Sequence, residues 1–308
     1  MRVNTIIFDA VNFNSVQELR RAFSMLTTEQ MVRLRGRFDF NVCPDALRGG
    51  DRACIVLSRG EMNIDASEAV INLYLHDVSG DACGLYIAPS AQGSAVRGLS
   101  LNVYGSDKKS RGLTGVFAEG SGILLENARI TVQSKAAEWV TGIAMGKGAY
   151  GADLFGCRVG VFGGASGQFL RGISSAADGC CFFGNRISVR AQQGGYANPE
   201  GRVSGAVGII DDGEASLWRG NSVFADAVEC TGAFLSGRDI SLSGGRIMLH
   251  GIYCSAAESP GGKNYISDNT VKCRREAIKP EYLRNMGVLR GCEPRQNAAQ
   301  RYRGKYFV

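Results

Sequence analysis

Residues 125–132 read LENARITV, residues 154–161 read LFGCRVGV, and residues 182–189 read FFGNRISV. Each segment begins with a large apolar residue, has Asn or Gly at its third position and Arg at its fifth, and ends with aliphatic residues two apart. The same pattern recurs around seven anchor residues spaced 29, 29, 28, 36, 24 and 24 residues apart: Leu101, Ile130, Val159, Ile187, Val223, Ile247 and Val271. A recurrence on this period indicates a repeat architecture.

Two short strands joined by a bend are predicted in every repeat. The residue two positions after each anchor is small or apolar, as the inward face of a strand requires. Large apolar residues stand five positions before the anchors: Val96, Leu125, Leu154, Phe182, Trp218, Leu242 and Ile266. The position between them holds only residue types that tolerate a left-handed backbone: Gly98, Asn127, Gly156, Gly184, Gly220, Gly244 and Asp268.

A third strand in each repeat is marked by a glycine followed by an aliphatic residue: Gly115-Val116, Gly142-Ile143, Gly172-Ile173, Gly208-Ile209, Gly232-Ala233 and Gly251-Ile252. Repeats of this size, built from short strands around columns of aliphatic side chains, predict an all-β, single-domain parallel β-helix. A β-propeller would instead need blades of roughly 40 to 45 residues with antiparallel hairpins. Over about residues 95–273 the pattern resembles the right-handed β-helix superfamily of pectate-lyase-like enzymes and phage tailspikes.

The chain divides into three expected parts. Residues 1–41 form an N-terminal cap, because Ser15 and Glu18 make a capping box and Val16, Leu19 and Phe23 follow one face of a helix over residues 15–26. Residues 42–273 form the β-helix, and residues 274–308 form a basic cap or arm. Residues 272–308 carry ten Lys or Arg and three Glu, a charge of +7, so the rest of the chain sums to −1.

Composition excludes several classes of protein. Hydrophobic residues make up 44% of the chain and the 42 glycines have no period of three, so disorder and collagen are excluded. No apolar run is long enough to insert into a membrane, and residues 1–14 lack a signal-peptide pattern, so we expect synthesis in the cytoplasm and release by lysis. No phosphate-binding glycine motif is present and no cofactor is expected. Nucleic acid is not favoured as a partner, since only the basic tail indicates it.

No metal site is expected either, because no CxxC motif occurs and only His76 and His250 are available. The chain has ten cysteines, which we expect to be reduced in a cytoplasm. Four of them lie outside the inward columns and could form disulfides in an oxidising medium: Cys43, Cys83, Cys157 and Cys292.

Arginines are the first candidate contact residues. Arg129, Arg158 and Arg186 each precede an anchor, so they should face outward about 4.8 Å apart on successive coils. Like charges in register repel unless an anionic partner answers them. The alternative is solvated arginines that bond to the carbonyls of the bend. The full set of predicted contact residues adds the next such position and four residues of the tail: Arg246, Arg274, Arg275, Arg301 and Arg303.

Four acids are the candidate catalytic residues. Asp178 and Glu214 each follow a glycine-led pair by the same number of residues on adjacent coils, so their carboxyl groups would lie near the roughly 5 Å of a retaining glycosidase. Asp211 and Asp212 stand beside them. The alternative is that these acids solvate a loop. A pectate-lyase-like mechanism would instead need a calcium site and an arginine base, for which Asp211, Asp212 and Arg171 can be named although no spacing singles them out.

The sequence favours a phage virion surface or structural protein of the tailspike, fibre or capsid-decoration type. By analogy with tailspikes it would be a homotrimer that contacts other virion proteins or an anionic or cell-surface polysaccharide. Two alternatives stay open. One is a polysaccharide hydrolase or lyase of the β-helix class, and the other is a non-catalytic cytoplasmic β-helix binding protein.

Overall fold

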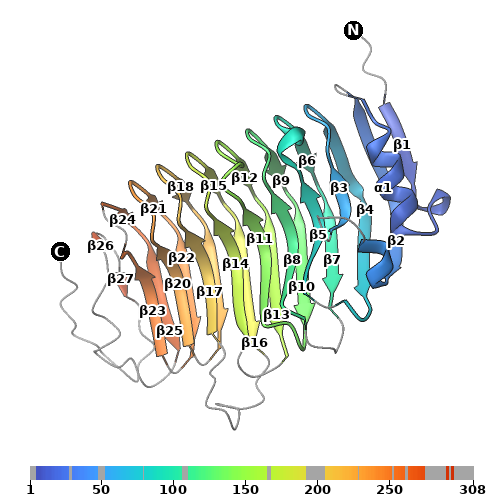
Figure 1. The fold of residues 1–308 in the computed structure, drawn as a ribbon. Coiled ribbons are helices and arrows are strands. Elements are labelled where there is room, and N and C mark those ends of the chain that lie inside the picture. The colour runs from blue at the N-terminus through green and yellow to red at the C-terminus, as the bar shows by residue number, and fades with distance from the viewer. Residues whose placement is uncertain are drawn as a thin grey trace.

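The computed structural model describes residues 5–27, 30–47, 53–78, 80–105, 110–164, 168–191, 205–227, 229–251, 253–260 and 263–274, and the strands Leu289–Arg290 and Glu293–Pro294. These segments wind into coils stacked along one axis, with the N-terminal helix at one end of the stack (Figure 1). The strands pair in parallel from one coil to the next. The predicted parallel β-helix is therefore confirmed. No helix in the described segments is long and apolar enough to cross a membrane.

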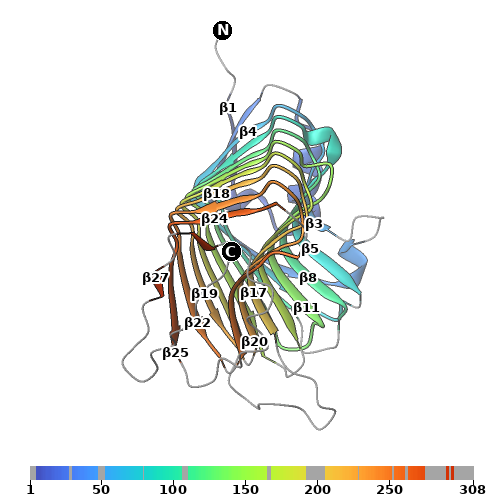
Figure 2. The same cartoon turned by 90° about the vertical axis from the view of Figure 1, so that its left-hand side faces the viewer.

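Each regular coil contributes one strand to each of three sheets (Figure 2). Sheet 1 consists of three-residue strands: β6 (Ala95–Arg97), β9 (Leu124–Glu126), β12 (Asp153–Phe155), β15 (Cys181–Phe183), β18 (Leu217–Arg219), β21 (Ser241–Ser243) and β24 (Tyr265–Ser267). Sheet 2 follows the bend: β7 (Ser100–Tyr104), β10 (Arg129–Ser134), β13 (Arg158–Gly163), β16 (Arg186–Ala191), β19 (Ser222–Asp226), β22 (Arg246–His250) and β25 (Thr270–Arg274). Sheet 3 closes the coil: β3 (Ala53–Leu57), β5 (Asp81–Ile87), β8 (Gly112–Ala118), β11 (Trp139–Met145), β14 (Phe169–Ser175), β17 (Gly205–Asp211), β20 (Glu229–Leu235) and β23 (Tyr253–Glu258).

The first coils are less regular. The strands β1 (Thr5–Asp9), β2 (Met31–Val42) and β4 (Asn63–Leu75) extend the stack in parallel beyond the region of regular repeats. Because β4 is long, it pairs with β6 in sheet 1 and with β7 in sheet 2. Three short 3-10 helices lie in the connections: η1 (Ala10–Asn12), η2 (Pro44–Leu47) and η3 (Pro89–Ala91).

The predicted capping helix is present as α1 (Val16–Ser24). The Ser15 hydroxyl accepts a hydrogen bond from the backbone N–H of Glu18 at 3.3 Å, and the Glu18 carboxylate accepts one from the N–H of Asn14 at 2.8 Å. The apolar face of α1 is buried, and the Arg20 guanidinium donates to the backbone carbonyl of Cys54 at 3.2 Å. The helix is thus held against β3 at the N-terminal end of the stack.

The bend between sheets 1 and 2 has the predicted backbone. Every residue of that column has a positive φ, between 52° at Asn127 and 68° at Gly98. The anchors also pair as predicted, since Ile130 faces Leu101 on one side and Val159 on the other, and the column continues to Val271. The glycine pattern therefore indicated both the bend and the register of the strands.

The interior holds polar ladders as well as apolar columns. Buried asparagines follow the bend on several coils, and the Oδ1 atom of Asn221 accepts from the backbone N–H of Asn185 at 2.9 Å. Its Nδ2 atom donates to the carbonyl of Phe182 at 2.8 Å. The same contact recurs at Asn269, whose Oδ1 accepts from the N–H of Gly245 at 2.8 Å. These side chains satisfy backbone groups that the bend leaves unpaired.

One predicted column requires a correction. The last glycine-led pair is not Gly251-Ile252, because Ala233 of β20 pairs with Ala257 of β23. Ala256 therefore occupies the glycine position in the final coil. The predicted pair begins 20 residues before the anchor Val271, whereas Ala256 precedes that anchor by 15 residues, as Gly232 precedes Ile247. The spacing, more than the glycine, identifies the column.

The basic C-terminal segment is described only in part. The strands β26 (Leu289–Arg290) and β27 (Glu293–Pro294) pair with β24 and β25 and continue the parallel stack. Three of the predicted tail contacts, Arg275, Arg301 and Arg303, lie outside the described residues, as does Cys292.

Candidate functional site

A groove of about 760 Å³ follows the outer surface of sheet 3 from β5 to β14. Its origin is a bend within each strand. Gly142 and Ile143 of β11 both face the interior, so the residue before them is sunk below its neighbours, and Thr141 is only 3% exposed. A side chain at Gly142 would place a Cβ atom 2.2 Å from Val159 and 2.7 Å from the carbonyl of Gly172. Only glycine fits there, and the repeated glycine makes the outer face of the sheet concave.

Two aromatic side chains, those of Phe117 and Trp139, and two arginines line this groove, and Phe169 lies beside it. Trp139 begins β11, and the Arg111 guanidinium lies 5.2 Å from the centre of its ring. Phe169 begins β14 directly beside Trp139 in the strand register, and the Arg171 guanidinium lies 4.9 Å from the centre of its ring. Each cation therefore lies near an aromatic ring, a favourable contact that also orients it.

The indole of Trp139 lies over the neighbouring strand. A Cβ atom at Gly112 would be 2.0 Å from the Trp139 Nε1 atom and 2.7 Å from a carboxylate oxygen of Asp81. The absence of a side chain at Gly112 thus creates the space that Trp139 occupies, and it brings Asp81 to the same part of the groove. Thr114 and Thr141, which are paired in the register, add a row of hydroxyl groups.

Arg171 is the most unusual group in the groove. Its Nε atom is buried and has no hydrogen-bond partner within the described part of the chain. Burial lowers the pKa of Arg171, an effect that the charge of Asp212 opposes. The sequence named Arg171 only as one candidate base, and it did not identify Trp139 or Arg111. A signal was present, since Trp139 and Phe169 both stand three residues before the glycine of their strand, where the side chain faces outward.

Three of the predicted catalytic acids gather at the turn after sheet 3. Asp178, Asp212 and Glu214 are all exposed. Asp178 accepts a hydrogen bond from the backbone N–H of Glu214 at 2.8 Å, so the two residues are neighbours on adjacent coils. Glu214 is paired with Arg238, and Asp212 accepts a hydrogen bond from Ser236. Each carboxylate is thus engaged with another group, and their catalytic role stays a prediction.

The fourth acid, Asp211, lies on the opposite side of the sheet. It is fully buried, and its carboxylate accepts hydrogen bonds from the Trp218 indole at 2.6 Å and from the backbone N–H of Gly213 at 3.0 Å. Burial raises the pKa of Asp211 to about 6, although these hydrogen bonds act in the other direction. Because water and substrate do not reach this interior position, its geometry is that of a structural carboxyl group.

The predicted arginine ladder is present on sheet 2. Arg129, Arg158 and Arg186 are paired in the strand register and exposed. Arg246 is exposed two coils further along, with Ser222 between it and Arg186. No ion pair or hydrogen bond engages the first three side chains within the described segments. A role for them in binding stays a prediction.

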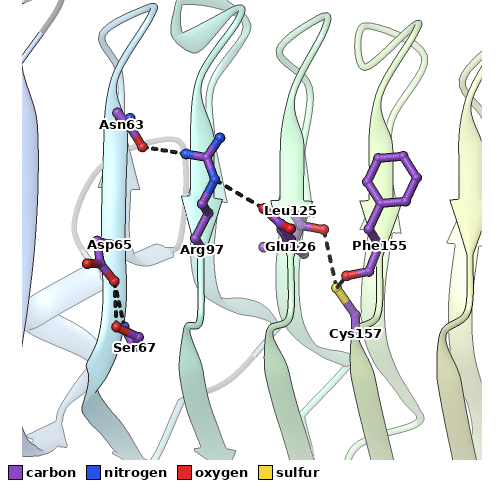
Figure 3. Close-up of polar contacts among 8 residues, drawn as sticks. All are labelled: Asn63, Asp65, Ser67, Arg97, Leu125, Glu126, Phe155 and Cys157. Carbon is purple, nitrogen blue, oxygen red and sulfur yellow. Dashed lines mark hydrogen bonds and ion pairs between the residues drawn. The ribbon is translucent and has the colours of Figure 1, made fainter.

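The cysteines whose side chains the structure describes are free thiols, Cys43, Cys83 and Cys157 among them, and disulfides formed in an oxidising medium stay a prediction. Cys157 is buried, with its sulfur 3.3 Å from the carbonyl of Leu125 (Figure 3). Burial raises the pKa of Cys157 to about 11, so the group is an unreactive core thiol.

Figure 3 also shows the Arg97 guanidinium between Asn63 and Glu126 on neighbouring coils, 3.1 Å from the Glu126 carboxylate. No cluster of three possible metal ligands occurs among the described residues.

No protein-family model matches the sequence, and no curated protein matches it. Two phage tailspike structures are among the solved structures that are similar to this chain. The Dettilon tailspike protein is 13% identical with a TM-score of 0.38, over 87% of this chain and 62% of that one. The enzymatically active domain of bacteriophage CBA120 tailspike protein 2 is 12% identical with a TM-score of 0.40, over 96% of this chain and 44% of that one. The chain therefore spans less than two thirds of either structure, and its fold is established by its own strand register.

Proposed function

We propose that this protein is a virion surface protein of the tailspike type whose β-helix binds a host surface glycan in the groove of sheet 3. The observation that carries the proposal is the groove itself, in which aromatic rings, guanidinium groups, hydroxyl groups and a carboxylate meet. Sugars present apolar C–H faces and many hydroxyl groups. Concave sites that combine aromatic surface with a few fixed polar groups suit such ligands.

The rigidity of the scaffold supports this function. Trp139 and Arg171 stand on strands that pair on both sides with neighbouring coils, so the groove is formed before the ligand arrives. A preformed site loses little conformational entropy on binding. A long groove parallel to the axis of the coils also suits an extended polymer.

Contact with other copies or other virion proteins is proposed for sheet 2. The exposed arginine ladder has no partner within the described residues, and an acidic surface would relieve its repulsion. On the adjoining sheet 1, the rings of Phe155 and Phe183 stack 5.3 Å apart on the outer surface. A homotrimer would bring such a surface of one copy against a different surface of the next, as a closed ring requires.

Capture of bacterial surface polysaccharides on an array tests the glycan role. We expect the wild-type protein to bind at least one polysaccharide and Trp139→Ala to lose that binding, because the indole occupies much of the groove beside Gly112. Tyr265→Ala, which removes an exposed aromatic ring from sheet 1, is the matched control and should bind normally. Binding that survives Trp139→Ala would place the glycan elsewhere, and the absence of any binding would refute the function.

Cleavage of the polysaccharide is the second candidate function. It is favoured by the position of Asp212, whose charge reaches Arg171 in the groove, and by the two acids beside it. If the protein cleaves the glycan that it binds, Asp178→Asn and Glu214→Gln should each abolish product formation without loss of binding. Product formed at the normal rate by both variants would eliminate these acids.

A further inference from the structure

The groove of sheet 3 has a positive electrostatic character. Two guanidinium groups, those of Arg111 and Arg171, line it together with the single carboxylate of Asp81. Arg111 directly precedes β8, and Arg171 lies in β14, two strands further along the stack. Two strand spacings amount to about 10 Å, so the cations are spread along the groove rather than gathered at one point.

Arg171 lacks the partner that such a group requires. Its Nε–H group is buried against the sheet and has no acceptor in the described part of the chain, while the charge of Asp212, which directly follows β17, acts on the guanidinium. Arg171 as a whole is only partly exposed, so its guanidinium is partly desolvated and gains from an anionic partner. The forked arrangement of its donors matches a carboxylate, and an anionic oxygen of a ligand in the groove would meet the terminal nitrogens.

The surroundings indicate what carries that anion. Thr141 lies beside Arg171 in the register and Thr114 beside Thr141, so hydroxyl groups continue from the arginine toward Trp139. Asp81, at the far end, accepts hydrogen bonds from hydroxyl groups but repels phosphates. This combination suits a hydroxyl-rich chain with isolated acidic groups, and it disfavours a continuous polyphosphate such as nucleic acid.

We propose that the glycan bound in this groove is an acidic saccharide, and that Arg171 holds a carboxylate of one of its sugar residues. The inference rests on the proposed glycan-binding function and specifies its ligand class. Arg111, held against Trp139, would face a second acidic group or a hydroxyl of a neighbouring sugar.

The test is an array of bacterial capsular polysaccharides in which each acidic polymer is printed beside its carboxyl-reduced form. Single-stranded oligothymidine is included as a polyphosphate. Binding of soluble fragments is followed by the fluorescence of Trp139, since Trp218, the other tryptophan of the chain, is buried in the core. The variants are Arg171→Gln, which removes the charge, and Arg171→Lys, which keeps it without the fork.

Arg190→Gln is the matched control. The Arg190 guanidinium lies 4.7 Å from the ring centre of Phe224, much as Arg171 lies near Phe169, but on the outer surface of sheet 2. The variant changes the net charge by the same amount outside the groove.

We expect the protein to capture one or more acidic polymers and to bind their carboxyl-reduced forms at least about tenfold more weakly. Arg171→Gln should weaken binding by about 10- to 100-fold, the effect of losing a charge-assisted hydrogen bond, and Arg171→Lys by less. Arg190→Gln should bind as the wild type does.

Equal binding of the carboxyl-reduced and acidic polymers by the wild-type protein would overturn the inference, and this result does not depend on whether any variant folds. So would a preference for neutral polymers, or for oligothymidine. If Trp139→Ala still abolished binding of a neutral polymer, the glycan-binding function would stand and only the acidic ligand would be wrong. If no polysaccharide were captured, the function itself would fall.

Discussion

The buried carboxyl group of Asp211 makes the stability of this β-helix depend on pH in an unusual direction. The residue lies in an interior column of sheet 3, where its counterparts on neighbouring coils are Ser175 and Leu235. Burial raises its pKa from an ordinary 3.8 to about 6. The change to test is Asp211→Asn, which keeps the shape of the side chain and removes the titration.

The magnitude follows from the difference between the two pKa values. A group that binds its proton more tightly when folded stabilises the folded state below the unfolded pKa and loses that contribution as the pH rises through the folded pKa. For Asp211 this window extends from about pH 4 to a little above pH 6. At 1.36 kcal/mol per pKa unit, the full shift corresponds to about 3 kcal/mol of unfolding free energy, of which about 2 kcal/mol should be lost between pH 4.5 and 7.5.

The measurement is the free energy of unfolding by urea at intervals between pH 4.5 and 7.5. Asp211→Asn should also change the absolute stability. The two carboxylate oxygens accept from two donors, the Trp218 indole and the Gly213 N–H, whereas an asparagine side chain has one oxygen and would turn its NH₂ group toward one of these donors. The prediction concerns the difference between the two curves. Relative to Asp211→Asn, the wild type should lose stability as the pH rises.

A second measurement is the fluorescence of Trp218, whose indole donates a hydrogen bond to the Asp211 carboxylate at 2.6 Å. In a Trp139→Phe background its fluorescence should titrate with a midpoint near pH 6. Asp212→Asn, an exposed neighbour, controls for the change in net charge. Parallel curves would refute the raised pKa of Asp211. A wild type that gains relative stability with rising pH would mean that the hydrogen bonds to the carboxylate outweigh its burial.

Four further changes test separate parts of the structure. Gly112→Ala should displace Trp139, shift its fluorescence and weaken glycan capture, while the free energy of unfolding changes little, because the added Cβ meets the indole and not the core. Asn221→Ala should lower the free energy of unfolding by about 2 to 4 kcal/mol, since it leaves buried backbone groups of Asn185 and Phe182 without partners; an unchanged urea midpoint would contradict this. Arg158→Glu should change the mass measured by light scattering if the arginine ladder contacts another copy, and an unaltered oligomer would exclude that role. Removal of residues 275–308 should leave the coils folded, as judged by circular dichroism, but abolish docking to other virion proteins if the basic tail is an arm.

The fold was predictable because its constraints repeat. Gly98, Asn127 and Asp268 occupy the same bend for the same reason, a positive φ, and each repetition reinforces the others. The one misplaced position, in the last coil of the glycine column, shows the limit of prediction from residue type. Ala256 takes the glycine position in β23, the end strand of sheet 3 among the described residues, so the residue type changes there while its distance to the anchor Val271 is kept.

The candidate site was less predictable, because most of the residues that line the groove differ in type from one coil to the next. Asp178 and Glu214 were correctly placed beside each other from their common distance to a glycine, but the same arithmetic did not show that Asp211 points inward. That orientation depends on alternation from Gly208, where two consecutive residues face the interior and reverse the expected side. Cys157, which the sequence placed outside the inward columns, is also buried, because it follows the bend, where the chain turns its side chain into the core.

The same irregularity that obscured Asp211 also creates the groove. If the strands of sheet 3 alternated strictly, their outer surface would be flat and Thr141 and Arg171 would be exposed in the manner of the arginines on sheet 2. The glycine-led pair instead bends each strand, so that Thr141 is buried and Arg171 is only partly exposed on the outer side of the sheet. The glycine column is required because a side chain there would clash with the aliphatic anchors. The row of outward residues that directly precede these glycines, which includes Thr141 and Arg171, is recessed as a consequence and needs no other sequence feature. The chemistry of the groove is then set by a few residues on that row and beside it, above all Trp139 and Arg171, whose side chains face away from the core.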